Sequence, residues 1–129
     1  MSSWRWIGAE LIFAIHDRQL AEHGGLDGIR DRGSVEAALA RPINLAGYGN
    51  PEAAALAAAY AWGLLRNHAF LDGNKRTAWV AARVFLADNG YELRIDAFSA
   101  ISTVEAAAAG NVSEEQLAAW FRERMTRVD

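Results

Sequence analysis

Residues 51–79 read PEAAALAAAYAWGLLRNHAFLDGNKRTAW, and this stretch decides the fold. Residues 53–65 are apolar on every side of a helix, a pattern that predicts a helix buried all round and therefore a central one. Asn50-Pro51 supplies a capping side chain followed by Pro at the first helical position, so we expect this helix to run from there to about Asn67. A second helix is expected to begin near Asn74, which leaves a short junction between the two.

The remainder of the chain also predicts helices and gives no sign of a second domain. Ala, the best helix former, is abundant, and Pro, the worst, occurs only twice. Further helices are expected over residues 8–22, 35–40, 74–89, 96–109 and 113–125. Their ends are marked by Ser34, a loop through Pro42 and Gly47–Gly49, a cap at Asp96, and a Ser113/Gln116 capping box. Only residues 91–95 alternate as a strand would, so we predict a single all-α domain over residues 1–129.

Composition excludes several classes of protein. The chain carries 13 Lys and Arg against 16 Asp and Glu, a net charge of −3, which argues against direct binding of nucleic acid or anionic membrane. Cys is absent, which removes disulfides, thiolate catalysis and cysteine-based zinc sites. The longest uncharged apolar run, residues 53–65, is shorter than the roughly 20 residues that span a bilayer. Arg5 and Glu10 interrupt the apolar amino-terminal residues, unlike a signal peptide, so we expect a soluble, cytoplasmic protein.

The positive charges are concentrated in one window of this acidic chain. Residues 66–83 hold four Lys or Arg residues and one acidic residue, Asp72. A compact basic region on an acidic protein favours a small anionic ligand such as a phosphate chain. A solvated helix face with scattered arginines is the alternative explanation.

The junction within this window supplies the groups that bind phosphate. The first turn of the helix that begins at Gly73-Asn74 presents unpaired N–H groups and a partial positive charge, and Gly73 lets the backbone approach a ligand closely. Lys75 and Arg76 add full positive charges, and Arg binds phosphate oxygens bidentately.

Two further side chains complete the chemistry of a transfer reaction. Asp72 offers the hard oxygen ligands that Mg²⁺ takes when it also holds substrate phosphates. His68 carries an imidazole, the side chain that most often serves as a general base on a hydroxyl group. Taken together and in this order, residues 68–76 predict a phosphoryl- or nucleotidyl-transfer site. Taken singly, His68 would be explained as a helix C-cap and Gly73 as part of a simple turn.

Residues 68–78, HAFLDGNKRTA, resemble the signature of the Fic family, and specifically of its Doc ("death on curing") branch. The resemblance extends over residues 11–42, which include EHGGLDGIRDRGSVEAALARP, and over residues 96–122. It implies a compact six-helix fold. It also implies that His68 is the general base on a target hydroxyl and that Asp72 holds Mg²⁺ at the phosphates of ATP.

The same resemblance assigns roles to the residues that follow. The backbone of Gly73-Asn74, together with Asn74, Lys75 and Arg76, would cradle the phosphates of the nucleotide. Arg76 would also act in catalysis by stabilising the charge that develops during transfer.

Lys75 separates two activities known in the family. Relatives that transfer AMP usually have Gly at this position, whereas Doc proteins have Lys and are protein kinases that bind the nucleotide in the reverse sense. The resemblance therefore implies a serine/threonine kinase that transfers the γ-phosphate of ATP to a Thr of elongation factor Tu and so stops translation. Ala69, where AMP-transferring relatives often have Pro, is compatible with the Doc branch. The sequence lacks the internal inhibitory motif of some Fic proteins, so restraint would come from a Phd-type antitoxin that folds into a groove on this toxin.

Two alternative functions remain open at this stage. The first is AMP transfer to a protein hydroxyl, which Lys75 disfavours. The second is a partner-binding module without activity, which the intact set of His68, Asp72, Asn74 and Arg76 disfavours.

Two histidines, one arginine and two tryptophans outside the junction have no assigned role in the predicted site. We expect His16 and His23 to have surface or helix-end roles, because no carboxylate or third ligand completes a metal-binding spacing with them. Arg83 could steer phosphate or a partner, or be a plain surface residue. Trp4 and Trp6 have no explanation from sequence.

Overall fold

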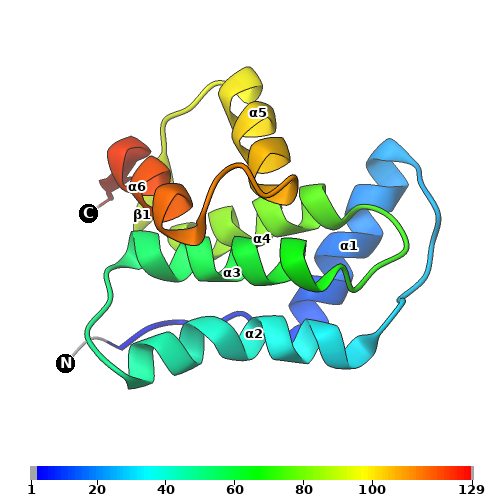
Figure 1. The fold of residues 1–129 in the computed structure, drawn as a ribbon, viewed down its shortest axis with the longest axis horizontal. Helices are drawn as coiled ribbons and strands as arrows, with labels where there is room; N and C mark the ends of the chain where they lie inside the picture. The colour runs from blue at the N-terminus through cyan, green and yellow to red at the C-terminus, as the bar shows by residue number, and fades with distance from the viewer. Residues whose placement is uncertain (1–2, 129) are drawn as a thin grey trace.

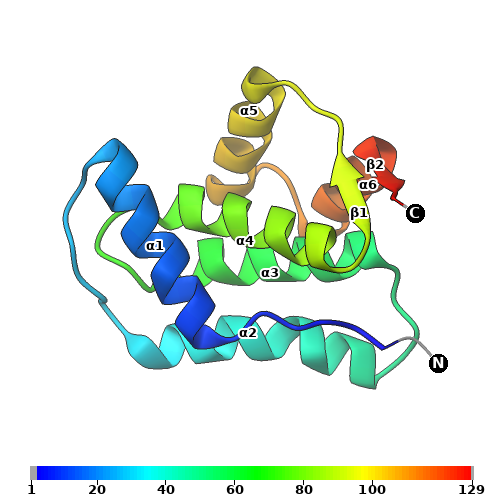
Figure 2. The ribbon, with the colours of Figure 1, turned by 180° about the vertical axis from the view of Figure 1, so that it is seen from behind.

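A computed structural model describes residues 3–128, which form six α-helices and one small sheet (Figures 1 and 2). The elements are α1 (Ala9–His23), α2 (Arg32–Gly47), α3 (Ala53–Asn67), α4 (Asn74–Asp88), β1 (Tyr91–Leu93), α5 (Ala97–Ala108), α6 (Glu114–Arg124) and β2 (Met125–Arg127). The predicted all-α, six-helix fold is confirmed. Within residues 3–128 no helix has the length and apolar character needed to cross a membrane.

Helix α3 is the centre of the molecule, as its sequence predicts. It packs against α2 on one side and against α4, α5 and α6 on the others, and Figure 1 shows it running between α2 and α4. Nearly all of its residues from Ala53 to Leu65 are buried. The helix begins two residues later than predicted, because Glu52 is the extended N-cap and its carbonyl accepts the N–H of Ala55 at 3.1 Å.

Helix α2 is much longer than the predicted 35–40 segment. Asp31, not Ser34, caps its amino end by accepting the N–H of Gly33 at 2.9 Å. Pro42 does not end the helix but lies inside it. Pro lacks the N–H that would bond the Ala38 carbonyl, yet both residues are buried, so packing keeps the helix continuous against a local propensity.

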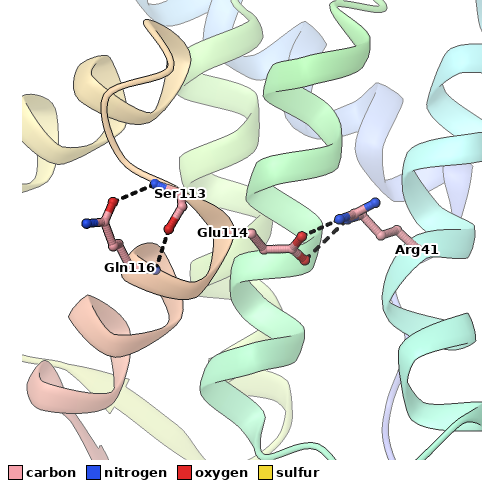
Figure 3. Close-up of polar contacts among 4 residues, drawn as sticks. All are labelled: Arg41, Ser113, Glu114 and Gln116. Atoms are coloured by element: carbon pink, nitrogen blue, oxygen red, sulfur yellow. Dashed lines mark hydrogen bonds and ion pairs between the residues drawn. The ribbon is translucent and has the colours of Figure 1, made fainter.

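The carboxyl-terminal part is tied to the rest by polar contacts and a two-stranded sheet. The predicted caps are confirmed: Asp96 accepts the N–H of Ser99 at 2.8 Å, and Ser113 and Gln116 form a capping box (Figure 3). Figure 3 also shows Glu114 of α6 paired with Arg41 of α2.

The last helix was predicted to run to about Met125, and α6 ends one residue earlier, but the strand that follows it was not predicted. Helix α6 ends at Arg124, and residues 125–127 form β2, which pairs antiparallel with β1 over residues 91–93. The partner of the alternating stretch lies more than thirty positions away in sequence, so no local pattern marked it. Trp4 and Trp6 also gain an explanation, because their rings pack on Phe85 with centroids 6.0 Å apart in each case.

Gly63 allows α2 and α3 to approach closely. A Cβ atom at this position would lie 3.2 Å from Ala38 Cα and 3.3 Å from the Ala38 carbonyl oxygen. Those atoms belong to the backbone of α2 and cannot rotate away, so a side chain here requires the two helices to separate.

We therefore expect Gly63→Val to destabilise the protein by about 1–3 kcal/mol, the usual range for overpacking a core. Urea unfolding followed by circular dichroism measures the effect. Gly47→Ala is the control, because a Cβ at Gly47 in the last turn of α2 meets no described atom within 4 Å. A Gly63→Val protein with the wild-type unfolding midpoint would contradict the tight approach.

Candidate active site

The junction between α3 and α4 is shaped by two residues in the left-handed conformation. His68 is the C-cap of α3 with φ 49°, and Gly73 is the N-cap of α4 with φ 79°. Within residues 3–128, His68 alone among non-glycine residues has a positive φ. His68 is thus both the helix cap and an exposed side chain at the mouth of the junction.

Asn74 fastens the junction with both polar atoms of its side chain. Its Oδ1 accepts the N–H of Phe70 at 3.1 Å, and its Nδ2 donates to the Phe70 carbonyl at 2.8 Å. Asn74 is 7% exposed and Phe70 1%. Asn74 therefore holds the loop closed through its side chain, and the group it offers to a ligand is its backbone N–H in the first turn of α4.

Asp72 presents an exposed carboxylate that is already held by two backbone donors. Its Oδ2 accepts the N–H of Leu26 at 3.2 Å, and its Oδ1 accepts the N–H of Gly73 at 2.8 Å. These two bonds, with smaller contributions from the charges of Arg76 and His16, lower the pKa of Asp72. The carboxylate is therefore ionised at neutral pH, and its hard oxygen atoms fit Mg²⁺, which binds one or two carboxylates together with substrate phosphates.

A second segment, residues 24–31, connects α1 to α2 and bonds to the junction through its backbone. The Arg30 N–H donates to the Ala69 carbonyl at 2.7 Å, and the Leu71 N–H donates to the Gly28 carbonyl at 3.1 Å. Gly25 lies directly against the Asp72 carboxylate, since a Cβ there would lie 2.8 Å from Asp72 Oδ2. Backbone hydrogen bonds from residues 24–31 thus hold the junction between α3 and α4 in place.

The predicted site residues all line one cavity of about 590 Å³. From the junction and α4 the lining residues are His68, Leu71, Asp72, Gly73, Asn74, Lys75, Arg76 and Trp79. Helix α5, which packs on α4 (Figure 1), contributes Ala97, Ala100, Ile101, Val104 and Glu105. No sequence motif marks this second wall or its acidic residue Glu105, because their place depends on how α5 packs.

The other cations of the basic window lie outside this cavity. Arg66 donates to the Ala107 carbonyl at 2.9 Å and so joins α3 to α5. The Arg83 guanidinium lies over the ring of Trp79, 5.6 Å from its centroid. Of the four cations in the window, Lys75 and Arg76 remain for an anionic ligand.

His16 differs most from its predicted place. It is not at the surface or a helix end but in the middle of α1, 2% exposed. The fold also brings carboxylates toward it: ligand atoms of His16, Asp17 and Asp27 lie within 4.8 Å of one another, which the sequence spacing did not suggest. Exposed acidic groups often gather without an ion, so this cluster alone defines no metal site.

A second cavity of about 640 Å³ lies between α2, α3 and α6. Its lining includes Arg41, Tyr48 and Glu114, and it contains none of the predicted site residues. The first cavity is therefore the candidate active site.

Comparison with known sequences identifies the class of protein. The sequence model of the Fic/DOC family matches residues 6–86, which include the junction and everything that supports it from α1 and α2. The chain belongs to the Fic/DOC family.

Two relatives place it within that family on the Doc branch. It is 33% identical to "Protein kinase doc" of Escherichia phage P1 over 119 residues, 92% of this chain and 94% of the relative. It is 49% identical to "Toxin Doc" of Mycolicibacterium smegmatis over 76 residues, 57% of this chain and 58% of the relative. The chain thus spans less than two thirds of the length of the mycobacterial relative and nearly all of the phage one.

The close approach at Gly25 gives a direct test of how the site is supported. Gly25→Ala adds a Cβ that meets the Asp72 carboxylate, at a φ of 127° that side chains rarely adopt. We expect this variant to lose measurable binding of Mg²⁺ with ADP in calorimetry while keeping its helical circular dichroism. Gly24→Ala is the control, because it is strained at φ 78° but meets no described atom within 4 Å. Equal loss of binding in both variants would show that strain, and not contact with Asp72, is responsible.

Proposed function

We propose that this chain is the toxin of a toxin–antitoxin pair and a protein kinase that phosphorylates a Thr hydroxyl of elongation factor Tu. The observation that carries the proposal is that His68, Asp72 and the amino end of α4 line one cavity. The names of the two Doc relatives, a toxin and a protein kinase, support the activity. Phosphorylation of this factor would stop translation, and the reaction would take place in the cytoplasm.

The nucleotide is expected to lie with its phosphates at the amino end of α4. The backbone N–H of Asn74, with the side chains of Lys75 and Arg76, would hold them. The Gly73 N–H donates to Asp72 Oδ1 in the unliganded protein and would join them by exchanging that bond for one to a phosphate oxygen. Asp72 would hold Mg²⁺, which supplies positive charge to the phosphate oxygens when bound. Most of the catalysis of phosphoryl transfer comes from such positioning and charge stabilisation.

The transfer step itself needs one base. The hydroxyl oxygen of the target Thr attacks the γ-phosphorus of ATP, and the bond from that phosphorus to the bridging oxygen breaks, releasing ADP. His68 takes the hydroxyl proton, and Arg76 stabilises the charge that develops on the transferred group. The exposed position of His68 at the mouth of the cavity gives a protein substrate access to it.

Lys75 is the residue that favours γ-phosphate transfer over AMP transfer. It lines the cavity one residue after the first position of α4, and its long charged side chain is larger than the Gly usual in relatives that transfer AMP. Transfer of AMP would need the α-phosphate in that space. AMP transfer is therefore the alternative outcome of the test below.

Control of the toxin is expected to come from a separate Phd-type antitoxin. Two large apolar side chains that line the cavity are exposed, Leu71 at 49% and Ile101 at 59%, and Phe98 of α5 is 79% exposed. Apolar surface of this kind beside a catalytic cavity suits an amphipathic helix of a partner protein.

Incubation of the protein with elongation factor Tu, Mg²⁺ and ATP, followed by intact mass spectrometry, tests the proposal. We expect the factor to gain a single phosphate, and label from γ-labelled but not α-labelled ATP. His68→Ala should reduce the rate by about 10²–10⁴-fold, the usual contribution of a general base.

His23→Ala is the matched control, because His23 is exposed at the end of α1 and does not line the cavity. Its rate should equal that of the wild type. Addition of AMP would assign the chain to the transferase activity. An unmodified factor together with toxicity that survives His68→Ala would instead indicate a binding module without catalysis.

A further inference from the structure

His16 contacts the candidate site from within the core. Its Nε2 lies 2.8 Å from the backbone carbonyl oxygen of Asp72, and its ring stacks on Phe70 with centroids 3.8 Å apart and an interplanar angle of 10°. A Cβ at Gly73 would lie 3.4 Å from the same ring. His16 thus contacts Asp72 and Phe70 and occupies the space beside Gly73, although it lies more than fifty positions earlier in sequence.

This hydrogen bond fixes which ring nitrogen of His16 carries a hydrogen. A carbonyl oxygen only accepts, so the Nε2 atom of His16 must carry the hydrogen and donate it. This donor lies on the backbone atom of Asp72, while the N–H of Leu26 holds the carboxylate of the same residue. Asp72 is therefore held at both ends by groups that α1 and the loop after it provide.

We propose that His16 is a positioning residue for the phosphate and metal site. It holds the peptide between Asp72 and Gly73, and with it the bond from the Gly73 N–H to the Asp72 carboxylate, so that the carboxylate keeps the orientation that Mg²⁺ beside a phosphate requires. The proposal rests on the proposed function for its metal and nucleotide, but the orientation of the junction is a property of the unliganded protein.

The contacts of His16 distinguish this role from simple packing. Filling the core needs only the flat ring on Phe70, which Phe would supply equally well. Holding the Asp72 carbonyl needs a donor, which Phe lacks and which the terminal amide of Gln supplies at a similar reach. His16→Phe therefore removes the hydrogen bond and keeps the stack, whereas His16→Gln removes the stack and keeps a donor.

The first measurement is amide hydrogen exchange of the unliganded protein. We expect His16→Phe to speed exchange of the Leu71 and Gly73 amides, which donate to Gly28 and to Asp72 in the wild type, by about tenfold or more. The amides of residues 56–64 in α3 should not change. His16→Gln should restore at least part of the protection.

The second measurement is calorimetric binding of ADP over a series of Mg²⁺ concentrations. Residues that orient a metal ligand typically contribute 10–100-fold to metal affinity, so we expect His16→Phe to weaken the apparent Mg²⁺ affinity by at least about tenfold. Tyr60→Phe is the matched control, because it removes one buried hydrogen bond, from the Ile7 N–H at 2.9 Å, in the core away from the cavity lining. It should leave both readouts at wild-type values.

Three outcomes would overturn the proposal. One is wild-type exchange and Mg²⁺ affinity in His16→Phe, and another is an equal effect in Tyr60→Phe, which would indicate general destabilisation. The third needs no variant: long-range ¹H–¹⁵N spectra of the wild type should show His16 with its hydrogen on Nε2, and a hydrogen on Nδ1 alone would exclude the bond. If the wild type binds no ADP, the proposed function fails while the exchange and tautomer results still decide the role of His16.

Discussion

The burial of α3 on every side is the constraint on which the rest of the structure depends. A helix without a polar face must be surrounded, and here α2, α4, α5 and α6 all pack against it. Its carboxyl end then emerges at a fixed point, and the left-handed cap at His68 turns the chain directly into α4. The catalytic histidine of the proposed reaction is thus positioned by the end of the most buried element of the fold.

The amino end of α4 can bind a ligand because neighbouring groups hold its loop in place, while the first turn of a helix has backbone N–H groups without partners inside the helix. The side chain of Asn74 is occupied with Phe70, so that it stabilises the loop from inside. Residues 24–31 bond to the backbone of the junction, and Gly25 permits a contact with Asp72 that a side chain would block. Rigid support of this kind suits phosphoryl transfer, in which positioned charges supply most of the rate enhancement.

Sequence reasoning predicted those features that depend on local pattern. The apolar run predicted α3, and the capping residues predicted the starts of α5 and α6. The motif over residues 68–76 predicted the side of the cavity that the junction and α4 form. It was wrong about α2, where the propensity of Pro42 is outweighed by burial. It missed the strand over residues 125–127, which depends on a distant partner. His16 and Glu105 were missed as neighbours of the site for the same reason, since only tertiary packing brings them there.

The central claim is that the first turn of α4 is the phosphate-binding site of this protein. An NMR titration of the wild type with ADP and Mg²⁺, followed through backbone amide shifts, tests it most directly. The account predicts that the largest saturable shifts fall on Gly73, Asn74 and Lys75, whose N–H groups begin α4. Largest shifts at the second cavity beside Arg41 and Glu114, or no saturable shift at the start of α4, would contradict it.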